Sequence, residues 1–402
     1  MTSDMRPLKS MMAAGFFIVA VLGTARAQEP GSRAEEQARQ QQEKARALKA
    51  YKGPWIERQL LAIEKAGGFG VARGLFVTFG DIKRGSGFAL GPAYGKTFAS
   101  GAVVVAKGAY AFSHAKVAQL SLQSPALAGR RLLFKARGRW QDAPTVRVFA
   151  LGMDSPKTKT EYSETKTEVS GEAALAPVRF LRMGAGVGLE RFETGISHKA
   201  DPAQMDIFDG LPGVGADPRY VHGLAYAAID SRDGQGYSRR GSLLQATLHD
   251  YRQQNDGPYS FQRVDGAAEQ YVPILHGNWV IFLALRASTT ANTAGHDVPF
   301  FLMPDLGGHD LRGFSNYRFR DRHSILITAE YRWYAQEYLD GAIFYDAGKA
   351  VPLRGSLDFT GFKSSIGAGI RLHGPQTTAI RLEVAHSREG MRLLLKFSPV
   401  GQ

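Results

Sequence analysis

The 402-residue sequence has no cysteine, so it forms no disulfide and offers no thiolate ligand to a metal ion. A chain without thiols is compatible with export but does not establish it. Motifs for other metal centres are lacking too, since the sequence contains neither an HExxH motif nor an EF-hand loop. We therefore expect no metal ion and no cofactor.

Long hydrophobic runs are equally scarce. The longest is the stretch from Met11 to Gly23, which follows a positively charged start carrying Arg6 and Lys9. Its length falls short of the roughly 20 residues that a membrane-spanning helix needs, which argues against the alternative of a transmembrane anchor. Because Ala25-Arg26-Ala27 supplies a small-x-small cleavage site, residues 1–27 are predicted to be a signal peptide.

The composition is too polar for a bundle of membrane helices. Hydrophobic residues make up 44% of the chain, and the mean hydropathy is −0.22. A transmembrane β-barrel has this kind of average, because only alternate residues of each strand face lipid. If the chain crosses a membrane, it therefore crosses as strands.

Acidic residues are outnumbered by basic ones, which gives a formal net charge of +13. Such a charge could indicate a nucleic-acid-binding protein. Here, however, the lysines and arginines are scattered through alternating segments and do not gather on one helix. A polar barrel lumen, or contact with anionic lipid headgroups at the rim, explains the charge better, so no nucleic-acid partner is expected.

Residues 28–69 lack the period of the rest of the chain. The segment 28–50 is polar without an apolar stripe, and a short amphipathic helix around Trp55, Leu60 and Ile63 is predicted to follow, ending at Gly67-Gly68. This helical or disordered segment either caps one mouth of a barrel or serves as a linker.

From about residue 70 to the end, apolar and polar residues alternate with period two, and turn residues bound each segment. This pattern predicts seventeen candidate strands: 72–80, 85–93, 98–113, 115–124, 130–140, 144–152, 158–170, 178–193, 218–231, 239–251, 260–271, 277–290, 323–335, 339–349, 364–373, 377–387 and 391–398. Transmembrane barrels of this kind have even strand numbers, and 72–93 reads as one broken strand, so we expect about sixteen strands.

The alternation itself fits two folds. In 325–333, Ile327 and Tyr331 share one face, whereas Glu330 and Arg332 share the other. The apolar row would face the core of a soluble β-sandwich or the lipid around a barrel. The signal peptide, the strand number and aromatic residues at strand ends favour an all-β fold, a transmembrane antiparallel β-barrel over 70–402 that closes to satisfy its backbone in lipid.

One motif carries a family resemblance. The run Gly307-Gly308-His309-Asp310-Leu311-Arg312-Gly313-Phe314 precedes five candidate strands, and Phe344-Tyr345-Asp346-Ala347-Gly348 lies on the second of them. The region 301–397 thereby resembles the bacterial surface antigen domain, the barrel of the outer-membrane assembly superfamily that includes BamA and TamA. The resemblance implies a loop that folds into the barrel and places Arg312 against acidic lumen residues.

In this resemblance Arg312 pairs with Asp346, with Glu330 nearby, while Gly313 allows a backbone turn that a Cβ atom would forbid. Phe314, Phe344 and Gly348 complete the predicted lock. The alternative, read from the residues alone, is that Arg312 is an exposed loop cation and Asp346 a solvated turn residue.

The C-terminal strand resembles the assembly signal of outer-membrane barrels. Gly390, Leu393, Leu395 and Phe397 mark a strand of alternating apolar residues that ends in an aromatic one, although five residues trail beyond it. The family usually carries periplasmic polypeptide-transport (POTRA) domains before the barrel. Residues 28–69 show no such pattern, so the sequence predicts a barrel-only member.

Three functions remain open at this stage. The resemblance favours a barrel that aids the assembly or translocation of outer-membrane proteins or lipids, with client polypeptides or periplasmic factors as partners. The glycine-rich first strand, which carries Gly74 and Gly80, suggests a weakly paired seam to the last strand. A porin-like channel with a basic lumen is the alternative, whereas an enzyme is not expected because no GxSxG motif accompanies residues such as His222 and His249.

Overall fold

The computed structural model describes residues 74–129, 131–234, 236–275, 278–374 and 378–397. The chain divides into two compact units, 1–54 and 55–402, and every described residue belongs to the second. The predicted signal peptide, the spacer and helix over 28–69, the expected lack of POTRA domains and the tail after Phe397 all lie outside the described residues.

Sixteen antiparallel strands form one continuous sheet, and each strand pairs with its neighbours in chain order. They are β1 Gly74–Asp81, β2 Phe88–Thr97, β3 Val103–Ala111, β4 Lys116–Gln123, β5 Leu132–Val148, β6 Thr160–Val178, β7 Leu181–Ile196, β8 Arg219–Asp230, β9 Gly241–Gln253, β10 Phe261–Ile274, β11 Trp279–Asn292, β14 His323–Gln336, β15 Leu339–Val351, β16 Lys363–His373, β17 Thr378–Ser387 and β18 Gly390–Phe397. This confirms the predicted all-β barrel and its strand number.

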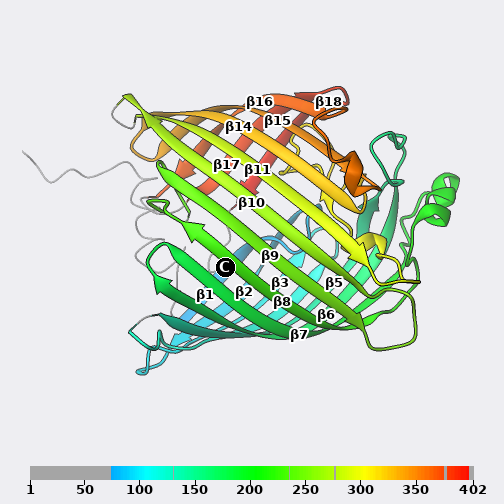
Figure 1. Ribbon diagram of the computed structural model, residues 1–402, viewed down its shortest axis with the longest axis horizontal. Coiled ribbons are helices and arrows are strands. Elements are labelled where there is room, and N and C mark those ends of the chain that lie inside the picture. Colours follow the sequence, from blue (N-terminus) through cyan, green and yellow to red (C-terminus); the bar gives the residue numbers. More distant parts are fainter. Residues whose placement is uncertain (1–73, 130, 235, 276–277, 375–377, 398–402) are drawn as a thin grey trace, which may run out of the picture. The chain divides into compact units, whose positions relative to one another are not determined.

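The sheet curls until its first and last strands meet (Figure 1). β1 and β18 approach one another, yet no backbone ladder joins them over the residues that the structure describes. Every other neighbouring pair in the sheet is hydrogen-bonded. The barrel is therefore nearly closed, with one unpaired seam.

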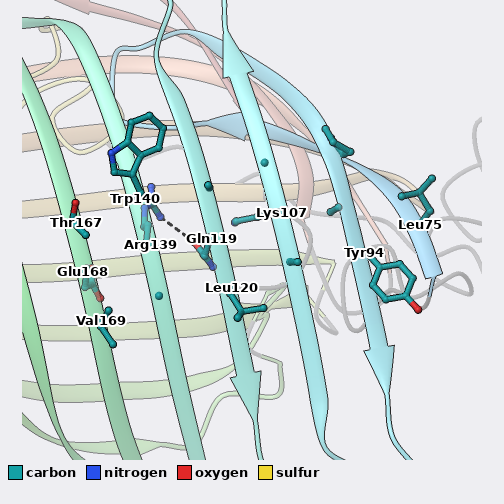
Figure 2. Close-up of a pocket in the computed structure, with 16 residues that line it drawn as sticks. Leu75, Tyr94, Lys107, Gln119, Leu120, Arg139, Trp140, Thr167, Glu168 and Val169 are labelled. Atoms are coloured by element: carbon teal, nitrogen blue, oxygen red, sulfur yellow. Dashed lines mark hydrogen bonds between the residues drawn. The ribbon is translucent and has the colours of Figure 1, made fainter.

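Inner and outer faces alternate along each strand, as the sequence pattern predicts. On β15, Phe344 and Asp346 are buried toward the lumen, whereas Ile343 and Tyr345 are about half exposed, at 50% and 48%. Figure 2 shows the same alternation near β4 and β5, where Leu120 and Trp140 lie on the outer face, opposite the hydrogen-bonded Gln119 and Arg139. An exposed apolar outer wall around a polar interior is the arrangement that lipid requires.

Two predicted strand boundaries are wrong, and the two errors cancel in the count. Segment 72–93 is not one broken strand but the hairpin of β1 and β2, because Gly85 and Gly87 take positive φ values of 84° and 76° and reverse the chain. Segments 130–140 and 144–152 belong mainly to one long strand, β5, whose pairing with β6 shifts between Ala143 and Val146. Pro144 lies in that shift, where its missing N–H cannot serve the ladder, so the interruption is a bulge and not a strand end.

Three short 3-10 segments lie wholly among the described residues: η1 Pro202–Gly210, η3 Phe300–Leu302 and η4 Arg354–Ser356. None of the helices in that part of the chain is long and apolar enough to cross a bilayer.

The two ends of the barrel differ in the length of their connections. At one end, here the loop end, the strands are joined by the long connections 149–159, 197–218, 293–322 and 352–362. At the other, the turn end, most connections are short, such as 337–338 between β14 and β15. The connection 293–322, here the lumen loop, carries the sequence motif and forms a small hairpin of its own, β12 Asp305–Leu306 with β13 Phe319–Arg320.

Candidate functional site in the barrel lumen

The lumen loop folds back on itself and enters the barrel. Gly307 and Gly308 have φ values of 126° and 65°, a backbone region that favours glycine, and the Gly308 N–H donates to the Phe314 carbonyl at 3.0 Å. An added Cβ at Gly307 would lie 2.0 Å from the Ser315 carbonyl oxygen. These glycines therefore let residues 307–314 form a compact turn, here called the knob. Arg312 is buried at its tip.

Arg312 is held by three carboxylates. Its Nε and Nη2 atoms each donate to Asp346 at 2.7 Å, which is a bidentate pair. Its Nη1 atom donates to Glu330 at 2.8 Å and to Glu383 at 3.1 Å. The structure thus places Arg312 against the two acids that the sequence motif indicated, and adds a third.

Aromatic and basic neighbours complete the cluster. The Arg312 guanidinium lies 3.4 Å from the centre of the Phe344 ring, a cation–π arrangement. Glu330 also accepts hydrogen bonds from Arg371 at 2.5 Å and from Arg332 at 2.8 Å. We call this set the arginine cluster; it consists of Arg312, Glu330, Arg332, Phe344, Asp346, Arg371 and Glu383.

The arginine cluster is buried, so the loss of one charged member is costly in free energy of folding. The side chain of Arg312 is 4% exposed, and those of Glu330 and Asp346 are 2% and 0% exposed. Removing one member of such a buried set leaves an uncompensated charge, which typically costs about 3–5 kcal/mol. The attachment of the loop to β14, β15 and β17 therefore depends on every charged member of the cluster.

Gly313 lies where the loop touches the wall. Its φ is 91°, and an added Cβ would approach the Cβ atoms of Ser365 and Ser387 to 3.0 and 3.1 Å. The Ser387 hydroxyl donates to the Gly313 carbonyl at 2.8 Å. Both the backbone conformation and the close approach thus require glycine here.

The other motif residues pack the loop. Phe314 is buried with its ring 5.1 Å from that of Phe319. At Gly348 on β15, an added Cβ would lie 2.9 Å from a methyl group of Leu306. The structure accordingly brings Arg312, Gly313, Phe314, Glu330, Phe344, Asp346 and Gly348 together at one face of the lumen loop.

Several anchors of the loop have no counterpart in the sequence prediction. Arg318 donates to Glu389 at 2.7 Å and to the Ser155 hydroxyl at 2.8 Å, and Arg84 donates to Asp310 at 2.7 Å. The Gly152 N–H donates to the Arg320 carbonyl at 2.9 Å, so the connection 149–159 also touches the loop. The loop is thus fixed on several sides of the barrel.

Burial and neighbouring charges shift the pKa values of two side chains in the lumen loop, Arg312 and His309. Burial opposes the charged form of Arg312, but the Asp346 hydrogen bonds and the neighbouring carboxylates raise the pKa of its guanidinium above the ordinary value. Burial, together with Lys396 and Arg381, lowers the pKa of His309 to about 4. At neutral pH the knob therefore presents one cation, Arg312, beside a neutral imidazole.

The predicted assembly-signal residues lie on β18. Leu393 and Leu395 are on the outer face and are 71% and 49% exposed, while Leu394 between them is buried. Gly390 begins the strand, and Phe397 pairs with Ile380 of β17.

His222 and His249, which the sequence left unassigned, face each other in the lumen with 3.0 Å between Nε2 and Nδ1. Glu190 and Asp265 flank the pair at 2.9 and 3.2 Å. In the described part of the chain, no group of three histidine or acidic side chains is arranged to hold a metal ion.

Comparison with known protein families gives a match for the part of the chain that contains this site. Residues 222–390 match the model of the Omp85 superfamily domain, a stretch that contains the knob and the whole arginine cluster. Over this stretch the chain is similar to the Omp85 superfamily domain. The resemblance inferred from residues 301–397 is thereby confirmed, and the match extends upstream into β8.

Solved structures agree at the level of the barrel fold. The crystal structure of BamA from Haemophilus ducreyi lacking POTRA domains 1–3 is similar with a TM-score of 0.60 and 13% identity, covering 82% of this chain and 70% of that one. CdiB from Escherichia coli is similar with a TM-score of 0.55 and 10% identity, covering 81% of this chain and 62% of that one. No curated protein matches the sequence.

Proposed function

We propose that this Omp85 barrel resides in the outer membrane of a Gram-negative-type bacterium and aids the assembly or translocation of outer-membrane proteins or lipids. The observation that carries the proposal is the unpaired seam between β1 and β18. An exposed strand edge presents free N–H and C=O groups, which can pair with a strand of another chain. A client polypeptide in extended form is the partner that such an edge fits.

The seam has a sequence basis. β1 is only eight residues long and contains Gly74 and Gly80, with φ values of 81° and 137°. Glycine weakens a strand, so β1 is a poor partner for a stable ladder with β18. The arginine cluster, by contrast, joins β14, β15 and β17 to the lumen loop through the ion pairs of Arg312.

Cross-linking across the seam tests the proposal. Asp81 lies on β1 and Lys396 on β18, the two strands that flank the seam, and the chain has no native cysteine. We expect an Asp81→Cys/Lys396→Cys variant joined by a bismaleimide to fold, but to lose the ability to support outer-membrane assembly in a deletion strain. A census of outer-membrane proteins is the readout, and the unlinked double variant is the control.

Full assembly by the cross-linked barrel would contradict the use of the seam. A deletion that leaves the outer-membrane proteins and lipids unchanged would contradict the assembly role itself. Neither enzymatic activity nor a cofactor enters this proposal.

The porin-like alternative makes a different prediction. A passive channel should give a steady, anion-preferring conductance in planar bilayers without any client. The lumen loop enters the barrel and its basic residues are largely paired with acids, which favours a restricted lumen. Conductance measurements separate the two functions.

A further inference from the structure

The long connections at the loop end surround a cleft of about 1050 Å³, here called the loop-end cleft. All four long connections of that end contribute to its walls, the lumen loop among them. Apolar side chains such as Met153, Met303 and Val351 line much of it. A cleft of this size, with mainly apolar walls and a few polar groups, is typical of a site for a small organic molecule.

One acidic side chain in the loop-end cleft has a free oxygen. Asp321 lies two residues before β14 and is only 5% exposed. The Arg322 N–H donates to its Oδ1 atom at 2.8 Å. Its Oδ2 atom, by contrast, accepts no hydrogen bond from any residue that the structure describes, and no lysine or arginine among those residues forms an ion pair with it.

The space in front of this oxygen is open. Gly152 lines the cleft beside Asp321, and a Cβ atom added at Gly152 would lie 3.8 Å from Oδ2. Apart from the chain neighbours of Gly152, no other described atom would lie within 4 Å of that Cβ. The carboxylate of Asp321 therefore points from a buried position into the cleft.

The three basic side chains that line the loop-end cleft are each paired with an acid other than Asp321. The pairs are Lys349 with Asp358 at 2.5 Å, Lys363 with Asp154 at 3.3 Å and Arg322 with Asp297 at 2.7 Å. Among the described residues of the lining, Asp321 is thus the acid left without a basic partner. The cleft carries one unmatched negative charge.

This charge is unfavourable in the free protein. Burial raises the pKa of the Asp321 carboxyl, and the N–H and the charge of Arg322 offset that effect only in part. A cation that hydrogen-bonds to the carboxylate would compensate its loss of hydration. A bare metal ion fits less well, since no group of three histidine or acidic side chains in the described part of the chain is arranged to hold one.

We propose that the loop-end cleft binds a small organic cation whose ammonium or guanidinium group pairs with the Oδ2 atom of Asp321. The apolar walls would hold the body of the molecule, and the unmatched carboxylate would select for its charge. In outer-membrane barrels the longer connections are extracellular, so the ligand would arrive from outside the cell. The inference goes beyond the assembly role and does not depend on it.

A matched pair of probes tests the site. Benzamidine is a planar organic cation, and benzamide has nearly the same shape without the charge. We expect benzamidine to bind the full chain in nanodiscs about tenfold more tightly than benzamide, measured by saturation-transfer NMR, because only the cation pairs with Asp321. Equal binding of the two probes, or no binding of benzamidine, would overturn the proposal.

Asp321→Asn removes the charge but keeps an oxygen that can accept from the Arg322 N–H. We expect this variant to bind benzamidine about tenfold more weakly and benzamide unchanged. Asp206→Asn is the matched control, because Asp206 is an exposed acid of η1 at the same end and does not line the cleft. Equal loss of binding in the two variants would mean that overall charge attracts the probe, and would refute the site.

Stability measurements separate ligand binding from a structural role of Asp321. Because its charge is buried without a cation, Asp321→Asn should not lower the denaturant midpoint of unfolding. A lower midpoint together with unchanged benzamidine binding would show that the carboxylate serves the fold and not a ligand. None of these readouts involves a client or the seam, so failure here leaves the proposed function untouched.

Discussion

At the scale of single residues, Arg312 shows how a buried cation can organise a barrel. Three carboxylates from three strands converge on one guanidinium, and none of them is exposed enough to be solvated instead. A planar donor with five N–H groups can satisfy such a set, whereas a lysine ammonium cannot bind Asp346 in the same bidentate way.

Replacing Arg312 with alanine should therefore destabilise the barrel by about 3–5 kcal/mol. We expect the Arg312→Ala variant to lose or broaden the fast-migrating band of the unheated protein in electrophoresis. Arg312→Lys should have a stability between those of the unchanged protein and Arg312→Ala. Arg252→Ala is the matched control: Arg252 pairs with Asp250, but its side chain is 73% exposed, so its removal should cost about 0–1 kcal/mol. Equal behaviour of Arg312→Ala and Arg252→Ala would argue against the arginine cluster as a lock.

Gly313 allows backbone strain and side-chain contact to be separated. Gly313→Ala meets both a φ of 91° and the Ser365 and Ser387 side chains, whereas Gly361→Ala meets a φ of 68° in open space. We expect the Gly313 variant to lower the denaturant midpoint of unfolding clearly more than the Gly361 variant. Similar midpoints would mean that the close approach of the loop to β16 and β17 contributes nothing.

The sequence could anticipate part of this site. The resemblance indicated Arg312 against Asp346 and Glu330, and period-two phase puts Glu383 on the lumen face. Phase gives a face but no height along the barrel, so nothing in the sequence says that Glu383 or Arg371 meets the knob. The Arg318–Glu389 and Arg84–Asp310 contacts depend on the path of a long loop, which local patterns do not encode.

At the scale of elements, strand interiors are easier to predict than their ends. The pattern located β14 to β18 closely because their apolar and charged rows are clean. It divided β5 at Pro144, since proline and a change of phase look like a turn when only one strand is considered. It joined β1 to β2 because the turn at Gly85 and Gly87 is short and sits among further glycines.

The seam gives the element-scale prediction. Backbone amides on the unpaired edges of β1 and β18 should exchange their hydrogen with water much faster than amides of β10 and β11. The amides of β10 and β11 are paired on both sides. Hydrogen exchange by mass spectrometry, on the protein in detergent or nanodiscs, measures this directly. Uniform protection around the barrel would contradict the seam.

At the scale of the whole molecule, the sequence leaves one question open, which is whether lipid or a protein core surrounds the sheet. The alternation of apolar and charged rows predicted a closed sheet but could not decide between lipid and a protein core as its surroundings. The structure answers through its outer face, where large apolar side chains such as Leu75, Val187 and Leu393 remain 80%, 58% and 71% exposed. A soluble protein rarely exposes so much apolar surface, whereas a lipid-facing wall consists of it.

The central claim is that these strands form a membrane-spanning cylinder with an apolar outside and an ionic interior. Electrophoresis of membrane fractions with and without boiling tests it most directly. We expect the protein to be found in the outer-membrane fraction, to need detergent for extraction, and to migrate faster unheated than boiled. Recovery of a monodisperse protein from a detergent-free periplasmic extract, with the same mobility before and after boiling, would contradict it.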